Sequence, residues 1–358
     1  MDQIFHGGDV YSVPGPILDF SANINPLGIP DGVKKAVVAS VENCLHYPDP
    51  LCRKLRCALS EREGVLPDQI VFGNGAADLI FRLVQAVRPA RAVVPEPTFS
   101  EYEFALQASG CAVEHHMLCR EEGFSVTEQL LERLVPGVDL LFLCNPNNPT
   151  GKIIPPTLLL RLISRCQERG IRVVLDECFQ DFLEQPHMYT LVPRLEEFPH
   201  VVILKAFTKI YAIPGLRLGY ALSADPILVH EIERCGQSWS VSVPAQAAGL
   251  AALRETEYLR RTAELIPSER KRMIRKLRHL GMETADSEAN YVFFRTPCPG
   301  LGEALAQKGI LIRSCANYPG LDERDFRAAV RLPEENGKLL QEIQNWLEGP
   351  SFGAVETL

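Results

Sequence analysis

The stretch KAFTKIYAIPGLRLGY, residues 205–220, brings two lysines and an arginine close together in the sequence. Lys209 follows Thr208, and Arg217 comes eight residues later, after a Pro-Gly pair. A lysine amine can attack a carbonyl carbon and form a covalent bond, and an arginine can hold a phosphate through two parallel hydrogen bonds. Because a single lysine most often only solvates a surface, the chemical role of this stretch depends on the residues that accompany it.

Other residues able to bind a ligand follow the short apolar runs that precede this stretch. Small residues, an aromatic ring, an amide and a carboxylate follow four such runs in turn: Gly75, Ala76 and Ala77, then Phe99, then Asn148, then Asp176. Backbone N–H groups at the start of a helix can bind a phosphate. An aromatic side chain can cover a flat ring, although core packing explains a single phenylalanine equally well. A carboxylate at the tip of a buried strand requires a cationic partner, because burying an unpaired charge is costly.

The apolar runs are typical of strands that are buried on both faces. They show no alternation of polar and apolar residues, and helix-like segments separate them. The runs span residues 69–73, 91–97, 140–146, 171–177 and 201–207, and the clearest helical segments span 76–87 and 155–170. Alternating strands and helices predict an α/β fold with a mostly parallel sheet and helices on both of its faces. Ligands of such sheets bind beyond the carboxyl ends of the strands, which is where the residues named above lie.

The sequence pattern changes near residue 265, which predicts a second, smaller part of the fold. A basic helix is expected at 267–281, followed by short strands at 290–295 and 309–314 and a final helix at 334–347. We therefore expect a large domain of residues 40–265 and a small α/β domain formed by residues 1–39 and 266–358.

Composition and charge exclude several classes of protein. The 358 residues are 46% hydrophobic and 23% charged, as in an ordinary soluble globular protein, and the formal net charge of −8 argues against nucleic-acid binding. No apolar run approaches the roughly 20 residues that a bilayer-spanning helix needs, and the N-terminus lacks the pattern of a signal peptide. The eleven cysteines show no metal-binding spacing, so we expect no metal site, reduced thiols and a cytoplasmic location.

The ordered set of residues describes a binding site for pyridoxal phosphate. The lysine forms the covalent link to the cofactor, and the arginine and the helix start bind its phosphate. The carboxylate keeps the nitrogen of the pyridine ring protonated, which makes the ring an electron sink. Each residue alone is a weak signal, but their joint occurrence in this order is specific.

The motifs resemble those of the class I and II aminotransferases, which have fold type I of the pyridoxal-phosphate-dependent transferases. The resemblance covers essentially the whole chain and rests on NPTG (148–151), DECF (176–179) and TKIYAIPGLRLGY (208–220). It implies that Lys209 carries the cofactor, that Asp176 pairs with the ring nitrogen, and that Asn148 reaches the ring hydroxyl. It also implies a stacking residue, Phe99, and a phosphate cup formed by Thr208, Arg217, the backbone of Gly75, Ala76 and Ala77, and Tyr47 from a partner subunit.

Two positions depart from the family pattern. Phe179 stands where a tyrosine is usual, so no hydroxyl is available there for the ring oxygen. Ala206 stands where a serine or threonine would donate a hydrogen bond to the phosphate. Lys205 matches none of the family's functional residues, and we expect it to be a solvated or strand-edge charge.

Within the family, several stretches are most similar to the threonine-phosphate decarboxylases of cobalamin biosynthesis. They are HGGD (6–9), DFSANINPLG (19–28), DECFQDF (176–182), TKIYAIPGLRLGY (208–220) and IRSCANYPGL (312–321). This similarity implies decarboxylation of O-phospho-L-threonine to (R)-1-amino-2-propanol O-2-phosphate. The alternative is a histidinol-phosphate aminotransferase or a related transaminase, which more usually has glutamate in place of Ile24 and tyrosine in place of Phe179. A regulatory ligand-binding protein is a further alternative, which the intact Lys209 disfavours.

The resemblance also indicates which residues bind the substrate. Arg327 matches the arginine that grips the substrate carboxylate, through two parallel bonds as its planar guanidinium allows. The phosphate of a phosphorylated amino acid also needs cationic and amide partners, and the candidates are His6, Asn23, Arg313 and Arg331. The active form is expected to be a homodimer without a nucleic-acid or membrane partner.

Overall fold

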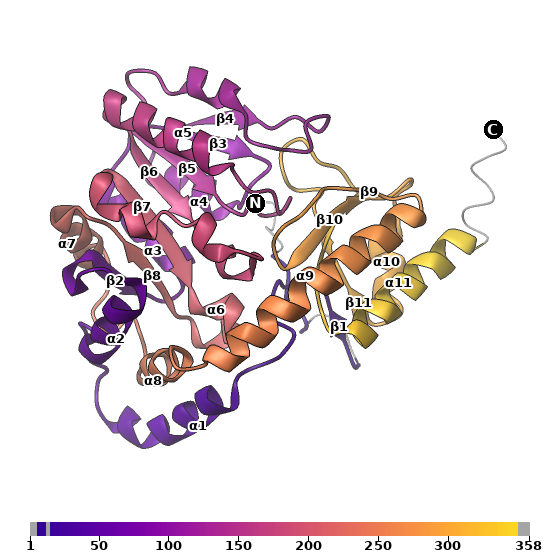
Figure 1. Ribbon diagram of the computed structural model, residues 1–358, viewed down its shortest axis with the longest axis horizontal. Coiled ribbons are helices and arrows are strands. Elements are labelled where there is room, and N and C mark those ends of the chain that lie inside the picture. The colour runs from indigo at the N-terminus through magenta and orange to yellow at the C-terminus, as the bar shows by residue number, and fades with distance from the viewer. Residues whose placement is uncertain (1–5, 12–14, 350–358) are drawn as a thin grey trace.

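The computed structural model describes residues 6–11 and 15–349 of the chain. Two unequal parts, each with its own sheet, lie side by side, and the long helix α9 (Thr256–His279) runs between them (Figure 1). None of the helices in the described ranges is long and apolar enough to cross a membrane.

The larger part is built on a seven-stranded sheet. From one edge to the other its strands are β2 (Ile70–Gly73), β8 (Gly219–Leu222), β7 (Val201–Ala206), β6 (Arg172–Asp176), β5 (Leu140–Cys144), β3 (Arg91–Glu96) and β4 (Ala112–Met117). The strands from β7 to β4 run parallel, whereas β8 is antiparallel to both of its neighbours. The mostly parallel sheet predicted from the alternating runs is confirmed.

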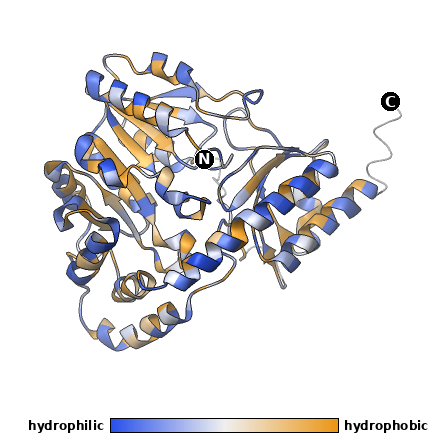
Figure 2. Ribbon diagram, viewed as in Figure 1, coloured by the Kyte–Doolittle hydropathy of each residue, from blue (hydrophilic) through white to orange (hydrophobic). Residues whose placement is uncertain are grey.

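Helices cover both faces of this sheet (Figure 1). The helices of this part are α2 (Arg53–Glu63), α3 (Ala76–Val87), α4 (Glu101–Ala108), α5 (Pro156–Arg169), α6 (Phe207–Ile210), α7 (Pro226–Arg234) and α8 (Val243–Ala252), together with α1 (Asp31–Ser40), which lies farther from the sheet and packs on α8. Successive strand residues enter different hydrophobic clusters: Val93 and Leu141 belong to one, and Val94 and Phe142 to the other. Both faces of the sheet are therefore buried, which explains the absence of polar alternation in its strands. Figure 2 shows these apolar strands enclosed by helices with hydrophilic outer sides.

The smaller part contains short strands and the last helices of the chain. Its four-stranded antiparallel sheet has the order β12 (Arg313–Ser314), β13 (Asp325–Ala329), β10 (Tyr291–Arg295) and β9 (Glu283–Thr284). Beside it, β1 (Leu18–Asp19) pairs in parallel with β11 (Ile310–Leu311), and α10 (Leu301–Ala306) and α11 (Pro333–Glu348) complete this part. The N-terminal strand thus joins the C-terminal half of the chain.

Helix α9 is longer than the sequence indicated. The basic helix was expected to begin at residue 267, because proline favours the first turn of a helix. Instead Pro267 lies inside α9, which begins at Thr256 and crosses residue 265, where we expected the domain boundary. Buried residues on both sides of the proline, such as Tyr258 and Met273, continue one apolar stripe. Tertiary packing of this stripe outweighs the local effect of proline.

Lys205 is not the solvated charge that the sequence suggested. It lies on β7, its side chain is 6% exposed, and its Nζ forms ion pairs with Glu63 Oε2 at 3.6 Å and Asp181 Oδ1 at 3.7 Å. Burial opposes the charge, but the carboxylates of Asp181, Glu63 and Glu177 outweigh this effect and raise the pKa of Lys205. The lysine therefore neutralises the acidic side chains that surround it.

We expect Lys205→Met to lower the free energy of unfolding by about 3 kcal/mol, because removing one partner of a buried ion pair leaves carboxylates uncompensated. Urea unfolding followed by circular dichroism measures the change. Lys338→Met, at an exposed position, is the matched control and should stay within about 0.5 kcal/mol of the wild type. Equal stability of the two variants would contradict this role of Lys205.

Candidate active site

A cavity of about 380 Å³ lies at the carboxyl ends of β5, β6 and β7. Residues of the N-terminal segment and of the smaller sheet line its other side. The cavity brings together thirteen residues that the sequence predicted: His6, Asn23, Ala76, Ala77, Phe99, Asn148, Asp176, Phe179, Thr208, Lys209, Arg217, Arg313 and Arg327. Gly75, Tyr47 and Arg331 do not line it.

Backbone and arginine form a cradle at one end of the cavity. Helix α3 begins at Ala76, and Gly75 precedes it with φ +83° and no side-chain cap, so the first N–H groups of the helix are not satisfied by a capping side chain. A Cβ on Gly75 would lie 2.5 Å from Arg217 Nη2, so glycine is needed for this close approach. Arg217 donates weakly to Pro214 O at 3.2 Å and Asn74 O at 3.4 Å, which leaves most of its donors for an anion. Helix start and guanidinium together fit a phosphate.

Lys209 lies on the one-turn helix α6, directly after β7, and faces the cavity. Burial, with help from the positive charges of Arg327 and Arg217, lowers the pKa of Lys209 to about 8. Its amine is in no ion pair with a carboxylate of the described chain, in contrast to Lys205. A lysine of this kind is neutral, and therefore nucleophilic, much closer to physiological pH than an ordinary lysine.

We expect the cofactor-free protein to show a Lys209 amine that titrates near pH 8 instead of near 10.5. Because the pKa is lowered, the reactive neutral form predominates above about pH 8 and the ammonium form below it. Competitive acylation at a series of pH values, read by peptide mass spectrometry, measures the midpoint, with the exposed Lys338 as comparison in the same sample. A Lys209 midpoint equal to that of Lys338 would contradict the expectation.

Asp176 ends β6 and is 5% exposed. Its Oδ2 accepts a hydrogen bond from the Tyr102 hydroxyl at 2.6 Å, and its Oδ1 accepts one from the Cys178 N–H at 2.9 Å. No lysine, arginine or histidine of the described residues forms an ion pair with this carboxylate. A buried carboxylate that is oriented by two neutral donors and borders a cavity fits a cationic group of a ligand, such as a protonated ring nitrogen.

Tyr102 was missed by the sequence analysis. Burial and the negative charge of Asp176 raise the pKa of its hydroxyl well above 10, so it stays a proton donor to the carboxylate. Its ring stacks on Phe142 with centroids 4.7 Å apart. The tyrosine lies in the helical segment EYEF, where no local pattern separates it from a core residue, so only its contact with Asp176 across the fold identifies it.

Arg327 connects the two sides of the cavity. From β13 it donates through Nη1 to Asn148 Oδ1 and through Nη2 to Ser21 O at 2.6 Å, while its Nε is buried without a partner. The sequence assigned Asn148 to the cofactor ring and Arg327 to the substrate, and the structure adds a direct contact between them. Since Oδ1 of Asn148 accepts a hydrogen bond from the arginine, the NH2 group of Asn148 (Nδ2) remains available to donate to a ring oxygen.

The opposite end of the cavity carries further polar groups. Arg313 donates to Asn317 Oδ1 at 2.8 Å and lies over the ring of Tyr318, with 5.5 Å from its Cζ to the ring centroid. His6 Nε2 lies 2.8 Å from Glu101 Oε1. Asn23 Oδ1 is buried without a hydrogen-bond partner, so this end has a polar atom that a ligand could satisfy.

Aromatic side chains border the cavity, and two predicted residues lie elsewhere. Phe99 packs edge-on against Tyr102, and Phe179 packs edge-on against Tyr291.

Arg331 and Tyr47 do not line the cavity. Arg331 binds the smaller part, donating to Asp19 O at 3.1 Å and to Glu335 at 2.7 Å. Tyr47 is 79% exposed and stacks on Trp239 with ring centroids 4.5 Å apart.

Comparisons with known proteins place the chain in a family. The family model described as aminotransferase class I and II matches residues 15–343. The threonine-phosphate decarboxylase of Salmonella typhimurium is 39% identical over 96% of this chain and 97% of its own. Histidinol-phosphate aminotransferase 1 of Cupriavidus pinatubonensis is 31% identical over 93% of this chain and 89% of its own. The crystal structure of the histidinol-phosphate aminotransferase of Clostridium acetobutylicum is 28% identical, with a TM-score of 0.87 over 93% of this chain and 99% of that chain.

The chain belongs to the class I and II aminotransferase family. Both the predicted fold and the predicted cofactor, pyridoxal phosphate, are confirmed by this membership. The donor set fits the cofactor: the cradle at Gly75 and Arg217 suits its phosphate, Asp176 its ring nitrogen, and Lys209 its aldehyde carbon.

Proposed function

We propose that this enzyme decarboxylates O-phospho-L-threonine and releases CO2 and (R)-1-amino-2-propanol O-2-phosphate. The observation that carries the proposal is the pair of arginines, Arg313 and Arg327, that remains in the cavity once Arg217 is assigned to the cofactor phosphate. Two such cations suit a substrate with two anionic groups, a carboxylate and a phosphate. The 39% identity to the Salmonella typhimurium decarboxylase, over nearly the full length of both chains, supports the same substrate.

The residues of the chain divide the work as follows. Pyridoxal phosphate, when bound, accepts the electron pair of the bond that breaks at the substrate Cα. Asp176 supplies the negative charge that keeps the ring nitrogen protonated, and Tyr102 holds Asp176 in place. Arg327 binds the substrate carboxylate in a fixed orientation, which selects the bond from Cα to the carboxylate for cleavage.

Lys209 completes the reaction by moving a proton. When the Cα–carboxylate bond breaks, CO2 leaves and Cα lacks one substituent. The Lys209 ammonium, once released from its link to the cofactor, donates a proton to Cα and becomes the neutral amine. Its pKa of about 8 suits both states, because the ammonium predominates at neutral pH while the amine becomes equally populated about one pH unit higher.

Histidinol-phosphate aminotransferase is the second candidate, and it is favoured by the TM-score of 0.87 to the Clostridium acetobutylicum structure. In that reaction the Cα–H bond breaks instead, and Lys209 takes the proton from Cα. Histidinol phosphate carries a phosphate but no carboxylate, whereas 2-oxoglutarate, which accepts its amino group in the same site, carries two carboxylates. The two arginines are therefore compatible with this reaction too, and the 39% identity to the Salmonella typhimurium decarboxylase favours the first candidate.

Incubation of the holoenzyme with O-phospho-L-threonine separates the two candidates. We expect release of CO2 and a phosphorylated amino alcohol in equal amounts, without formation of a 2-oxo acid. Removing the substrate phosphate should lower kcat/KM by about two orders of magnitude or more, because buried cations and amides then stay unpaired. Transamination of histidinol phosphate with 2-oxoglutarate, without CO2 from phosphothreonine, would establish the second candidate instead.

We further propose that the active form is a homodimer in which Tyr47 reaches the cofactor phosphate of the partner subunit. Tyr47 is exposed, lies outside its own cavity and stacks on the exposed Trp239. The exposed apolar residues Val41, Leu45 and Leu51 lie near it in the sequence. Burial of such a surface between two copies removes apolar area from water, and symmetric dimers are the commonest oligomers.

Mixing two inactive variants tests this arrangement. We expect a Lys209→Ala chain and a Tyr47→Ala chain to regain activity when they exchange subunits. In the mixed dimer one site has Lys209 from one chain and Tyr47 from the other, so at most half of the sites work. The same mixture of chains kept from exchanging is the control. No recovery under exchange, or full activity of a monomer in sedimentation, would contradict the shared site.

We propose a cytoplasmic location for the enzyme. All eleven cysteines are free thiols, and Cys44, Cys57 and Cys119 are exposed. Exposed thiols persist in a reducing compartment. Cell fractionation with an activity assay tests the location, and activity in an extracellular or periplasmic fraction would overturn it.

A further inference from the structure

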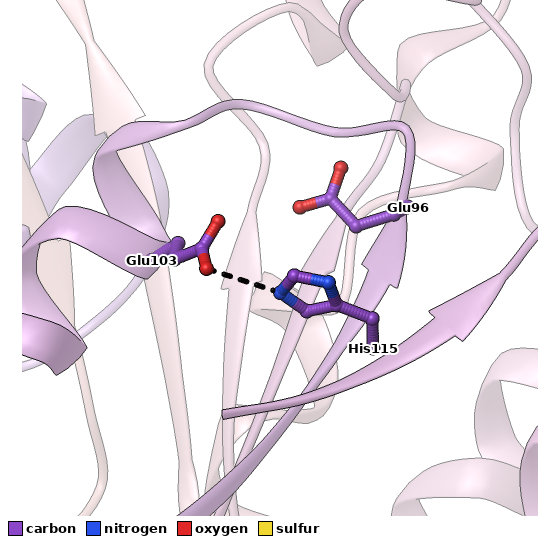
Figure 3. Close-up of side chains that lie close together, drawn as sticks. All are labelled: Glu96, Glu103 and His115. Atoms are coloured by element: carbon purple, nitrogen blue, oxygen red, sulfur yellow. Dashed lines mark ion pairs between the residues drawn. The ribbon is translucent and has the colours of Figure 1, made fainter. Parts of the chain in front are cut away.

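Three side chains with metal-binding atoms lie together at the edge of the large sheet, outside the cavity (Figure 3). Glu96 is the last residue of β3, His115 lies on the edge strand β4, and Glu103 lies in the first turn of α4. One ligand atom from each residue lies within 4.8 Å of those of the other two.

Strand register explains why these side chains meet. β3 and β4 are parallel, and His115 pairs with Val94, two residues before Glu96. Residues two apart on a strand point to the same face, so Glu96 and His115 share the face on which α4 lies. His115 Nε2 lies 3.2 Å from Glu103 Oε1, the contact drawn as a dashed line in Figure 3.

Glu96 indicates that a cation is missing from this group. It is 2% exposed, and the described residues give it one hydrogen bond, from Thr98 N–H to Oε2 at 2.7 Å. No basic side chain of the described chain forms an ion pair with it. A carboxylate in this position stays charged at low cost only if a cation compensates it.

We propose that Glu96, Glu103 and His115 bind one divalent cation of the zinc class. An imidazole nitrogen with two carboxylates is a ligand set that Zn²⁺ accepts, whereas Mg²⁺ and Ca²⁺ prefer oxygen ligands only. Three protein ligands leave a fourth position for water. The expectation of no metal site rested on cysteine spacing along the chain, and it did not cover ligands that come from three different elements.

The cation holds the segment that joins β3 to α4. This segment includes Phe99, which lines the cavity, and is followed by Tyr102, which donates to Asp176. None of the three proposed ligands lines the cavity. The role of the cation is therefore to position the segment, and the proposal does not depend on which reaction the enzyme catalyses.

Zinc binding to the full-length holoenzyme tests the proposal. We expect equilibrium dialysis against buffered Zn²⁺ to show one ion more per chain in the wild type than in Glu96→Gln or His115→Ala. Each substitution should weaken this site by at least about tenfold, the effect that losing even an outer partner of a ligand has. Zinc should also raise the thermal unfolding midpoint of the wild type, because a ligand of the folded state stabilises it, and should not raise that of the two variants.

Matched controls separate this site from exposed thiols and from loss of folding. Glu114→Gln on the same strand and His187→Ala at another exposed position should bind zinc like the wild type. His115 is itself exposed, so its replacement leaves the fold intact. Equal zinc binding by the wild type and both site variants would overturn the proposal. Displacement of the ion by an equal concentration of Mg²⁺ would overturn it too, because the imidazole would then not be a ligand.

Discussion

We expect the Lys209→Ala variant to lose its covalent link to pyridoxal phosphate and at least about 10⁴-fold in turnover, while it stays folded. A positioned acid or base alone contributes about 10²- to 10⁴-fold, and this lysine both forms the covalent link and moves the proton at Cα. Its place on α6, directly after β7, in one cavity with Asp176 and Arg327 motivates the prediction. Steady-state kinetics and the visible absorbance of the bound cofactor measure it.

The control for this variant must replace a lysine that does not contribute to the stability of the fold. Lys205 is unsuitable, because it is buried among carboxylates, so we choose the exposed Lys338→Ala. Borohydride reduction of the wild type, followed by peptide mapping, should attach the cofactor to Lys209. Near-wild-type turnover of Lys209→Ala, or a labelled peptide that contains a different lysine, would disprove the assignment.

The Asp176→Asn variant should still bind the cofactor but lose about ten- to a hundredfold in kcat. A neutral amide cannot hold the ring nitrogen protonated, and losing a hydrogen bond to a charged group costs roughly 1.5–3 kcal/mol. Asparagine has the same shape, but its single oxygen can accept only one of the two bonds that the carboxylate accepts, from the Tyr102 hydroxyl or from the Cys178 N–H. Turnover at saturating substrate measures the effect.

Two comparisons sharpen the Asp176 experiment. Asp68→Asn, at an exposed position, changes the net charge equally and should leave kcat unaltered. In the cofactor-free protein, the thermal unfolding midpoint of Asp176→Asn should change little, because the variant removes a buried charge without a cationic partner in the described chain but also loses one of the two hydrogen bonds that the carboxylate accepts. An unchanged kcat in Asp176→Asn would show that the carboxylate does not serve the ring nitrogen.

Much of the active site was predictable because parallel strands end at one edge of their sheet. The apolar runs were recognisable as buried strands, and whatever follows the runs that end in Cys144, Asp176 and Ala206 must meet at their common edge. Local chemistry then suggested individual roles: small residues at a helix start predicted a phosphate site, and Lys209 predicted a covalent link to the cofactor. The order of these signals along the chain was enough to indicate the cofactor and the family.

Contacts between distant segments decided the rest. No local pattern shows that Tyr102 donates to Asp176, or that Arg327 donates to Asn148, because each pair is brought together only by the packing of separate elements. The same holds for Lys205, whose acidic partners come from α2 and from the segment after β6.

The sequence by itself therefore determined the strands, the edge at which they deliver their functional groups, and the types of those groups. Only the tertiary structure decided which charges are compensated. Whether a lysine is solvated or buried, or a carboxylate such as Glu96 lacks a cation, depends on the dielectric environment and on neighbours that lie far away in the chain. The residue type determines which charge a position can carry. Burial and the neighbouring residues determine the free-energy cost of that charge and the pKa of the group.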